Sequence, residues 1–218
     1  GFLKKLFEEG KIYRGSDVVP WSGRSGTSYS QMEIIEGRKL VAHKSVFVRF
    51  PLKDRKEEYL LVWTTTPWTI PANKALAYNE ALDYVLIQLN DDGDFKNRKI
   101  VVAEALLDSV IKDCEIKDFK DIKKFKGKDL KDTICNHPFF DLGYEFDIPM
   151  LEARFVTTEQ GTGIVHCAPS HGPDDFNLCL NYGIKAIETV DGDGKYTKNV
   201  HLFEGNHIFK ANPIVIEN

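Results

Sequence analysis

Long hydrophobic runs are missing from this sequence, and so are the usual marks of export. No apolar run approaches the roughly 20 residues that a membrane-spanning helix needs. The Lys-rich start lacks the apolar stretch and small-residue cleavage site of a signal peptide. The four cysteines form no CxxC pair, and disulfide frameworks are typical of shorter, secreted chains. We therefore expect a soluble protein whose thiols stay free in a reducing compartment.

An excess of one charge is also missing. The sequence has 29 Lys and Arg residues and 33 Asp and Glu residues, which gives a formal net charge of −4. This balance excludes a protein that is basic overall, such as a histone-like binder. A local basic segment exists nevertheless, because residues 117–131 contain seven lysines and few apolar residues. Two interpretations of this segment stay open: a solvated surface, and a lysine face that contacts a polyanion.

Glycine-rich phosphate motifs are absent, and the expected elements show no βαβαβ order. Neither GxGxxG nor GxxxxGK[ST] occurs, so we do not expect a Rossmann fold. Short apolar runs between turn residues instead predict a mainly β fold with peripheral helices and a barrel-like β core. The patterns predict strands or extended segments at 39–50, 59–63, 84–89, 99–102, 146–150, 153–156, 163–166 and 208–216. They predict helices at 2–9, 104–112 and 173–182.

One segment with unusual chemistry is 63–73, which reads WTTTPWTIPAN. Consecutive threonines at the end of a strand present hydroxyls on alternating faces, so at least one must face the interior or a cleft. A hydroxyl both donates and accepts hydrogen bonds, which suits a site that orients water or an ester. The alternative is a β-branched strand end followed by a turn bounded by prolines.

A second such segment is 161–175, which reads GTGIVHCAPSHGPDD. Gly161 and Gly163 permit a close backbone approach or a positive φ. His166 follows a short apolar run, so we expect it at a strand end. Asp174 and Asp175 fall at the start of an expected helix, where a carboxylate is held ionised and can receive an ammonium group. The alternative is that both aspartates cap the helix and His166 is a satisfied core histidine.

Metal binding and nucleophilic catalysis fit these residues poorly. His166, Cys167, His171 and Asp175 are close in sequence, but Pro169 interrupts their spacing. The HExxH pattern is absent and no second Cys/His cluster is found, so we expect no metal site. A Cys–His pair is also disfavoured, because neighbours in a strand point to opposite faces.

Together the two segments resemble the editing domain of the class I aminoacyl-tRNA synthetases for isoleucine, valine and leucine. The run at 63–69 followed by Asn73 is most similar to the isoleucyl form. The valyl and leucyl enzymes read more like T-T-R-x-[ED]-T there, and this chain has Thr66 in place of the arginine. Residues 161–166 with 173–175 resemble the second motif of the family. Flanking residues 10–15 and 209–212 agree as well, so the resemblance covers essentially the whole chain.

The resemblance implies one editing domain over residues 1–218, excised from a larger synthetase. Residues 1–15 and 205–218 are then the segments that lead to the parent's catalytic domain. The HxGH-type signature and the KMSKS-type lysine loop of the synthetic site do not occur in the sequence. No synthetic activity and no cofactor are therefore expected in this domain, although the parent enzyme uses ATP and Mg. The implied location is the cytoplasm, or an organelle matrix if the parent is organellar.

The resemblance also implies a reaction, which is hydrolytic editing of mischarged Val-tRNA(Ile). The implied partners are the tRNA(Ile) acceptor end carrying valine and the rest of the synthetase, with no membrane. The implied catalytic residues are Thr65, Thr66, His166 and Asp175. The implied substrate-binding residues are Thr64, Trp68, Asn73, His166 and Asp175. Asp175 binds the α-ammonium group, His166 excludes isoleucine sterically, Trp68 walls the pocket, and a positioned water attacks the ester.

Two other functions stay open on the sequence. The chain could be a module that binds the acceptor end of tRNA without catalysis. It could also be a valyl- or leucyl-type editing domain, which would prefer mischarged threonine or norvaline to valine.

Overall fold

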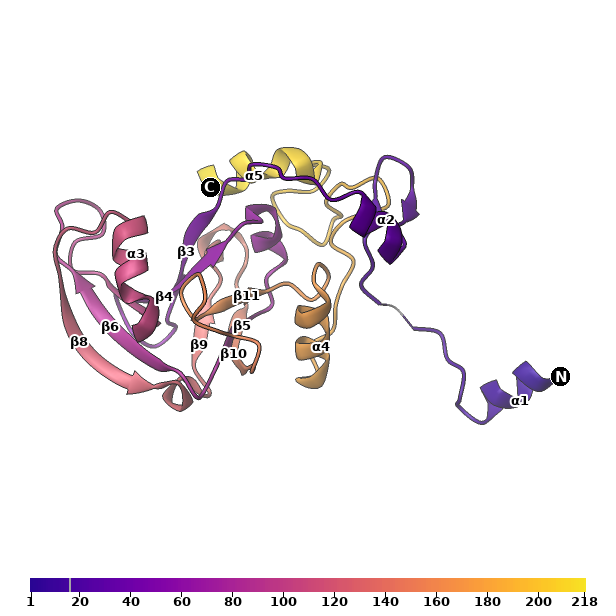
Figure 1. Cartoon of the computed structure of the whole chain (residues 1–218), viewed down its shortest axis with the longest axis horizontal. Coiled ribbons are helices and arrows are strands. Elements are labelled where there is room, and N and C mark those ends of the chain that lie inside the picture. The colour runs from indigo at the N-terminus through magenta and orange to yellow at the C-terminus, as the bar shows by residue number, and fades with distance from the viewer. Residues whose placement is uncertain (16) are drawn as a thin grey trace.

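The computed structural model describes residues 1–15 and 17–218, with β-sheets at the centre and short helices outside them (Figure 1). This confirms a mainly β fold with peripheral helices. The strands are β1 (Trp21–Ser22), β2 (Thr27–Ser28), β3 (Val46–Pro51), β4 (Glu58–Thr64), β5 (Ala75–Tyr78), β6 (Asp83–Leu89), β7 (Lys99–Ala103), β8 (Phe119–Lys126), β9 (Ile134–Asn136), β10 (Asp147–Glu152) and β11 (Val165–Cys167). The α-helices are α1 (Phe2–Glu8), α2 (Gln31–Glu36), α3 (Leu107–Asp113), α4 (Pro173–Asn181) and α5 (Ile208–Glu217). The 3-10 helices are η1 (Pro67–Ala72), η2 (Glu104–Leu106), η3 (Gly127–Leu130) and η4 (Phe140–Leu142).

Two larger sheets enclose the main core and meet at both ends. One has the strand order β3-β4-β7-β6-β8 and the other β11-β5-β10-β9. An isolated bridge between Leu52 and Cys135 joins the end of β3 to β9, and β11 contacts β4. Leu60, Leu76 and Ile148, from strands of both sheets, pack in one buried cluster. The core is therefore barrel-like, although within the described residues the hydrogen-bonded ladder is not continuous around it.

Strand β6 separates this core from a second one. Tyr84 and Leu86 belong to the main core, whereas Val85 and Ile87 pack with α3 on the other face of the sheet. This alternation follows from the two-residue period of a strand, and burial on both faces explains why β6 is apolar throughout its middle.

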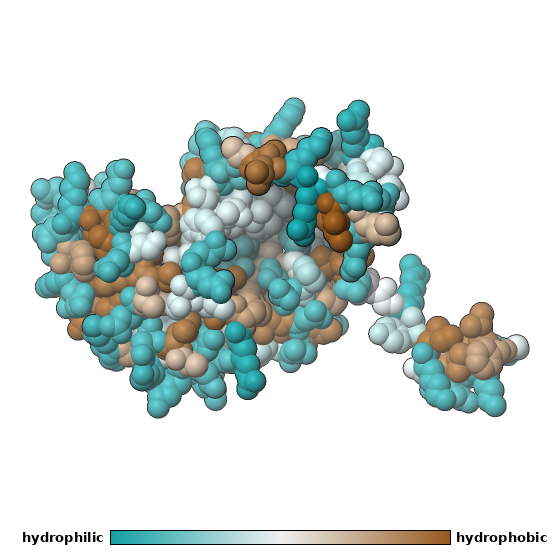
Figure 2. Space-filling view, viewed as in Figure 1, coloured by the Kyte–Doolittle hydropathy of each residue, from teal (hydrophilic) through white to brown (hydrophobic). Residues whose placement is uncertain are grey.

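The predicted helices are confirmed as α1, as η2 with α3, and as α4. Helix α1 lies apart from the β core in Figure 1 and has no buried residue. Its Phe2, Leu3 and Phe7 are exposed, and Figure 2 shows hydrophobic atoms gathered on this helix. None of the helices formed by the described residues is long and apolar enough to cross a membrane.

The final segment, predicted to be extended, is instead the helix α5. His207 caps its start, because the ring Nδ1 accepts a hydrogen bond from the amide of Phe209 at 3.2 Å. Ala211 and Val215 are four residues apart and are both buried in the cluster that also contains Ile70 of η1. The prediction was wrong because the apolar character of a short segment does not by itself distinguish a strand from a partly buried helix.

Three other predicted strands are shorter or absent. Within 39–50 only Val46–Pro51 is a strand, and 39–45 has no regular structure. Residues 153–156 form a turn, in which the Val156 amide donates to Ala153 O at 3.2 Å. The strand predicted at 163–166 begins only at Val165, because Gly163 has a φ of +76° that a strand cannot accommodate.

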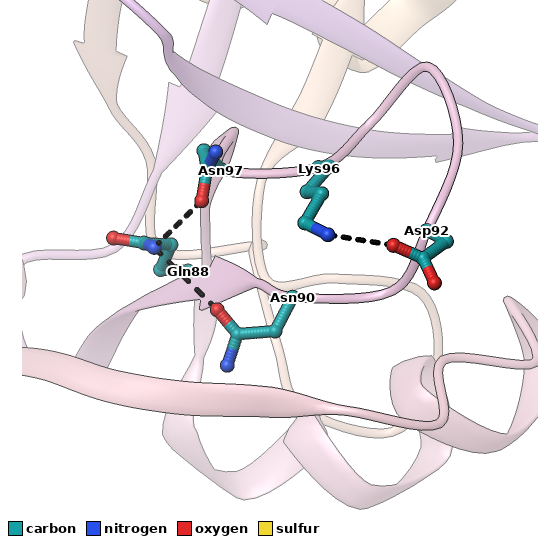
Figure 3. Close-up of polar contacts among 5 residues, drawn as sticks. All are labelled: Gln88, Asn90, Asp92, Lys96 and Asn97. Atoms are coloured by element: carbon teal, nitrogen blue, oxygen red, sulfur yellow. Dashed lines mark hydrogen bonds and ion pairs between the residues drawn. The ribbon is translucent and has the colours of Figure 1, made fainter.

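The loop between β6 and β7 is closed by local polar contacts, which Figure 3 shows. Lys96 Nζ lies 2.6 Å from Asp92 Oδ1 across the loop. The Gln88 side-chain amide donates to Oδ1 of both Asn90 and Asn97 at 3.4 Å. These contacts tie the two ends of the loop together and so support the antiparallel pairing of β6 with β7.

Candidate functional site

One cavity of about 340 Å³ lies where the two chemically unusual segments meet. This volume falls within the roughly 300–1,000 Å³ typical of pockets that bury small ligands. Its walls come from both segments and from a connecting turn at 155–160. The lining residues are Trp63, Thr64, Thr65, Thr66, Thr69, Phe155, Thr157, Gln160, Gly161, Thr162, Gly163, Ile164, Val165, His166, Ala168, His171 and Asp175. Segments 63–73 and 161–175, which together carry the family resemblance, are therefore adjacent in space.

The threonine side of the cavity forms where β4 ends and η1 begins. Thr64 is the last residue of β4, and its Oγ1 accepts a hydrogen bond from the Thr66 amide at 3.1 Å. Thr66 Oγ1 lies 3.2 Å from Thr64 Oγ1 and 3.3 Å from Thr69 Oγ1. Because a 3-10 helix has three residues per turn, Thr66 and Thr69 lie on the same side of η1. The exposed Thr65 and Thr66 thus line the cavity above the buried Thr64 and Thr69.

The glycine side of the cavity depends on a close approach between two backbones. Gly161 and Gly163 have φ values of +82° and +76°, which favour glycine. A Cβ atom on Gly163 would lie only 2.3 Å from the Cβ of Ala103 in β7. The Thr162 carbonyl accepts a hydrogen bond from the Ala103 amide at 2.8 Å. This contact holds the loop against β7. The chain then continues directly into β11, where His166 pairs with Leu76 of β5.

His166 is held by hydrogen bonds at both ring nitrogens. Asn73 Nδ2 lies 2.7 Å from Nδ1 and also donates to the Ala75 carbonyl at 2.9 Å, so it is the amide nitrogen that faces the ring. Nδ1 therefore accepts, and the proton of a neutral ring resides on Nε2. Nε2 donates to Thr69 Oγ1 at 2.9 Å, which in turn donates to the Thr66 carbonyl at 2.9 Å. The hydrogen bonds thus select one tautomer and one ring orientation.

Burial keeps His166 uncharged. Desolvation, helped by the nearby His137 and His171, lowers the pKa of His166 to about 3. A neutral ring whose only lone pair is occupied by Asn73 is a poor general base near neutral pH. Its chemistry suits a wall of the cavity.

Asp175 supplies the negative charge of the cavity. It lies in the first turn of α4, and its Oδ2 accepts the Ala168 amide at 2.9 Å. Burial raises the pKa of Asp175, although the hydrogen bond from Ala168 acts in the opposite direction and the charge of Asp174 adds to the increase. Asp174 is exposed and does not line the cavity. A partly desolvated carboxylate is stabilised by a cation, so Asp175 is suited to bind an ammonium group.

Two residues predicted to contact substrate lie behind the cavity lining. Trp68 was expected to wall the pocket, but its ring packs edge-on against His171 at 4.8 Å between centroids, and it is not among the lining residues. Asn73 is fully buried and reaches the cavity only through His166. Both residues therefore support side chains that line the cavity.

Several lining residues were missed on the sequence, and Thr69 and His171 are two of them. His171 donates to or accepts from Thr189 Oγ1 at 2.7 Å, and burial lowers its pKa to about 4. Thr69 could have been found from the three-residue period of a helix that starts at Pro67, since Thr66 already faces the cavity. The sequence carries no comparable signal for His171, whose position depends on the turn before α4.

The described residues contain no group of three or more His, Cys, Asp or Glu side chains that could hold a metal ion. Cys167 is also unsuited to nucleophilic attack, because burial raises its pKa well above the ordinary thiol value. The cavity thus offers hydroxyls, one carboxylate and neutral histidines, which can position a polar, cationic ligand and a water molecule.

The comparisons with known proteins begin with close sequence relatives. Over 99% of its length the chain is 69% identical to an isoleucine–tRNA ligase of Pelagibacter ubique. Over 96% of its length it is 39% identical to the same enzyme of Gluconobacter oxydans. The chain is a homologue of part of the isoleucine–tRNA ligases. It spans 24% and 23% of the lengths of these two relatives, and no family model matches it.

Solved structures place this isoleucine–tRNA ligase homologue in the fold of synthetase editing domains. The editing domain of P. knowlesi cytosolic leucyl-tRNA synthetase has a TM-score of 0.59 at 14% identity and covers 79% of this chain and 92% of that chain. A P. falciparum counterpart with deletions of insertions 1 and 3 has a TM-score of 0.53 at 15% identity, covering 76% of each chain. At such identities the likeness shows the fold alone.

Proposed function

We propose that this chain hydrolyses the ester of Val-tRNA(Ile) as the editing domain of an isoleucyl-tRNA synthetase. One observation carries the proposal: Asp175 and His166 line a single cavity together with the hydroxyls of Thr65 and Thr66. The carboxylate would hold the α-ammonium group of the misattached amino acid. The hydroxyls would contact the ester, the terminal adenosine or the attacking water.

Such a site would correct an error that the amino-acid-binding pocket of a synthetase cannot avoid. One methylene changes binding in a hydrophobic pocket by only about 1–3 kcal/mol, a range already established for isoleucine against valine in isoleucyl-tRNA synthetases. A synthetic site therefore cannot strongly reject valine. A second cavity that admits valine and excludes isoleucine removes the error, and the fixed ring of His166 is the residue that we assign to this exclusion.

The proposed hydrolysis uses a positioned water rather than a covalent intermediate. The histidine is uncharged and occupied at both nitrogens, and the cysteine nearest to it is buried as a thiol. Thr66 is already linked to Thr64 and Thr69, so its hydroxyl has a fixed orientation. Thr65 and Thr66 would orient the water, and the terminal ribose hydroxyl would assist the reaction. A fixed array of neutral donors favours the developing oxyanion without reorganisation.

The proposal extends to partners and domain organisation. The substrate would be the acceptor end of tRNA(Ile) carrying valine, and residues 1–15 and 205–218 would lead to the rest of the synthetase. The exposed apolar residues of α1 agree with contacts outside the β core. ATP and Mg would act in the parent enzyme, and we propose no cofactor for this cavity. The enzyme would work in the cytoplasm, or in an organelle matrix for an organellar parent.

The test is a hydrolysis assay with Val-tRNA(Ile) and Ile-tRNA(Ile), using Asp175→Asn as the control for contaminating activity. We expect release of valine at least about tenfold faster than release of isoleucine, which corresponds to 1.4 kcal/mol. Binding of tRNA without hydrolysis would identify a non-catalytic binding module instead. Faster release of threonine or norvaline than of valine would identify a valyl- or leucyl-type specificity.

A further inference from the structure

The lysines of β8 are divided between the two faces of the sheet according to whether they form ion pairs. Lys126 Nζ lies 2.6 Å from Asp83 Oδ1, and Lys124 Nζ lies 2.5 Å from Glu104 Oε1. Lys124 stands opposite Val85 and Lys126 opposite Asp83, so both side chains belong to the face of α3. The acidic partners neutralise the lysines on this face.

On the other face of β8 the lysines are without such partners. Lys123 stands opposite Leu86 and, beyond a bulge in the register, Lys120 stands opposite Gln88. Within residues 1–15 and 17–218, neither lysine forms an ion pair. Figure 1 shows β8 as the outermost strand at this end of the molecule, and Figure 2 shows hydrophilic atoms along the same edge.

A chain of contacts connects this free face to the cavity. Tyr84 donates its hydroxyl to the carbonyl of Gly163, a cavity residue, at 2.7 Å. The Tyr84 ring stacks on Phe125 with 6.1 Å between centroids and 21° between planes. Lys123 Nζ lies 5.8 Å from the centre of the Phe125 ring. The unpaired lysines are therefore on the same side of the sheet as the glycine loop of the cavity.

We propose that Lys120 and Lys123, on this free face of β8, bind the phosphate backbone of the tRNA whose acceptor end enters the cavity. The inference rests on the proposed function and names a second contact of the same substrate. Lysine ammonium groups on an otherwise acidic protein provide a local attraction for phosphates, which sets position rather than base specificity. Protection of a free sheet edge is the other known use of edge lysines, but it gives no reason for the two faces to differ in ion pairing.

The test compares two double variants of the same strand and the same charge. Lys120→Gln/Lys123→Gln removes the unpaired lysines, and Lys124→Gln/Lys126→Gln removes the paired ones as the matched control. Binding of uncharged tRNA(Ile) is followed by fluorescence anisotropy between 50 and 200 mM salt. We expect the first variant to bind more weakly, with a salt slope smaller by roughly one unit per lost phosphate contact. The control variant should keep the slope of the unmodified chain.

Equal slopes for both variants, or no tRNA binding by the unmodified chain, would overturn the inference. Self-association of the first variant on gel filtration, with an unchanged slope, would assign these lysines to protection of the strand edge. Because uncharged tRNA is the probe, failure of the proposed hydrolysis is detected separately. Lysine-dependent binding without release of valine would refute only the reaction, and release of valine with unchanged slopes would refute only the lysine contact.

Discussion

His166 is a single side chain on which both the shape and the hydrogen bonding of the cavity depend. Replacing it with alanine should enlarge the cavity and admit isoleucine. We expect His166→Ala to increase hydrolysis of correctly charged Ile-tRNA(Ile) by about 10-fold or more, within the range that one methylene can supply. The measurement is the ratio of deacylation rates for the isoleucyl and valyl esters.

This variant also leaves Thr69 and Asn73 without their buried partner, so its stability must be checked by thermal unfolding. Replacement of the exposed His43 with alanine serves as the control. A folded His166→Ala protein that still rejects isoleucine would show that another residue excludes it. Loss of all hydrolysis in a folded variant would assign His166 a chemical role.

Asp175 and Asp174 offer a matched pair at the start of α4. Losing a hydrogen bond to a charged group costs roughly 1.5–3 kcal/mol, so Asp175→Ala should reduce deacylation of Val-tRNA(Ile) by at least about tenfold. Asp175→Asn keeps an oxygen that can accept the Ala168 amide but removes the charge, so it should be nearly as damaging. Asp174→Ala should have a smaller effect, because that side chain is exposed.

Deacylation rates of these three variants decide the assignment. Equal losses in Asp174→Ala and Asp175→Ala would return both residues to the role of helix caps, and so would a fully active Asp175→Asn. The raised pKa of Asp175 also predicts how the hydrolysis rate depends on pH. As pH falls through that pKa, the carboxylate is protonated and hydrolysis should decline. Because the pKa is raised, this decline should occur at a higher pH than for an ordinary aspartate.

The glycine loop before β11 is the element that fixes the distance between the cavity and β7. Gly163→Ala adds a Cβ at a positive φ and in overlap with Ala103, whereas Gly161→Ala adds one at a positive φ with its nearest contact at 3.5 Å. An unfavourable φ costs about 1–3 kcal/mol, and overpacking typically adds about 1–3 kcal/mol. Gly163→Ala should therefore lower the free energy of unfolding by more than Gly161→Ala does. Urea denaturation of both variants measures the difference, and equal effects would mean that the loop moves away from β7 without strain.

At the scale of elements, the sequence predicts what local pattern determines and misses what tertiary contacts determine. The strands β4, β6, β7 and β10 were predicted because each contains a strong apolar run between turn residues. Strand β5 was not, since Ala75–Tyr78 is buried on both faces and shows no alternation. The helix α5 was mistaken for an extended segment, because its burial depends on contacts with η1 that no local pattern in the sequence shows.

The site was predictable to a similar extent. The two motifs led to Thr64, Thr65, Thr66, His166 and Asp175, and all five line one cavity. Trp68 is not among the lining residues, because a 3-10 helix repeats every three residues and Trp68 falls between Thr66 and Thr69. Which residues stand behind the lining depends on packing between segments about 100 residues apart, and no local pattern records it.

For the whole molecule, three buried histidines make stability depend on pH. Burial lowers the pKa of His166 to about 3 and those of His137 and His171 to about 4. In the unfolded chain they take up protons near pH 6.5, so their neutral burial supports the fold above that pH and is lost as pH falls toward the folded values. Each should lower the free energy of unfolding by about 1 kcal/mol between pH 7 and 5.5. The raised pKa of Asp175 acts in the opposite sense at the acid end.

Urea denaturation at pH 7 and 5.5 tests this expectation. His171→Gln should reduce the pH dependence by about one third, because it removes one of the three buried histidines. A free energy of unfolding that does not change over this range would mean that the buried histidines take up protons without unfolding.

The hydrogen bonds that define the cavity join residues far apart along the chain, and this separation affects the order of folding. Thr69 and Asn73 are separated from their hydrogen-bond partner His166 by 97 and 93 residues of chain. Strand β5 pairs with β10 and β11, both of which come much later in the sequence. Closing such long loops is entropically unfavourable, so non-local pairings form slowly. The β3–β4 hairpin, by contrast, needs only its own turn. During refolding the chain should therefore acquire hairpins early and its binding cavity last, after nearly all of its length has taken part.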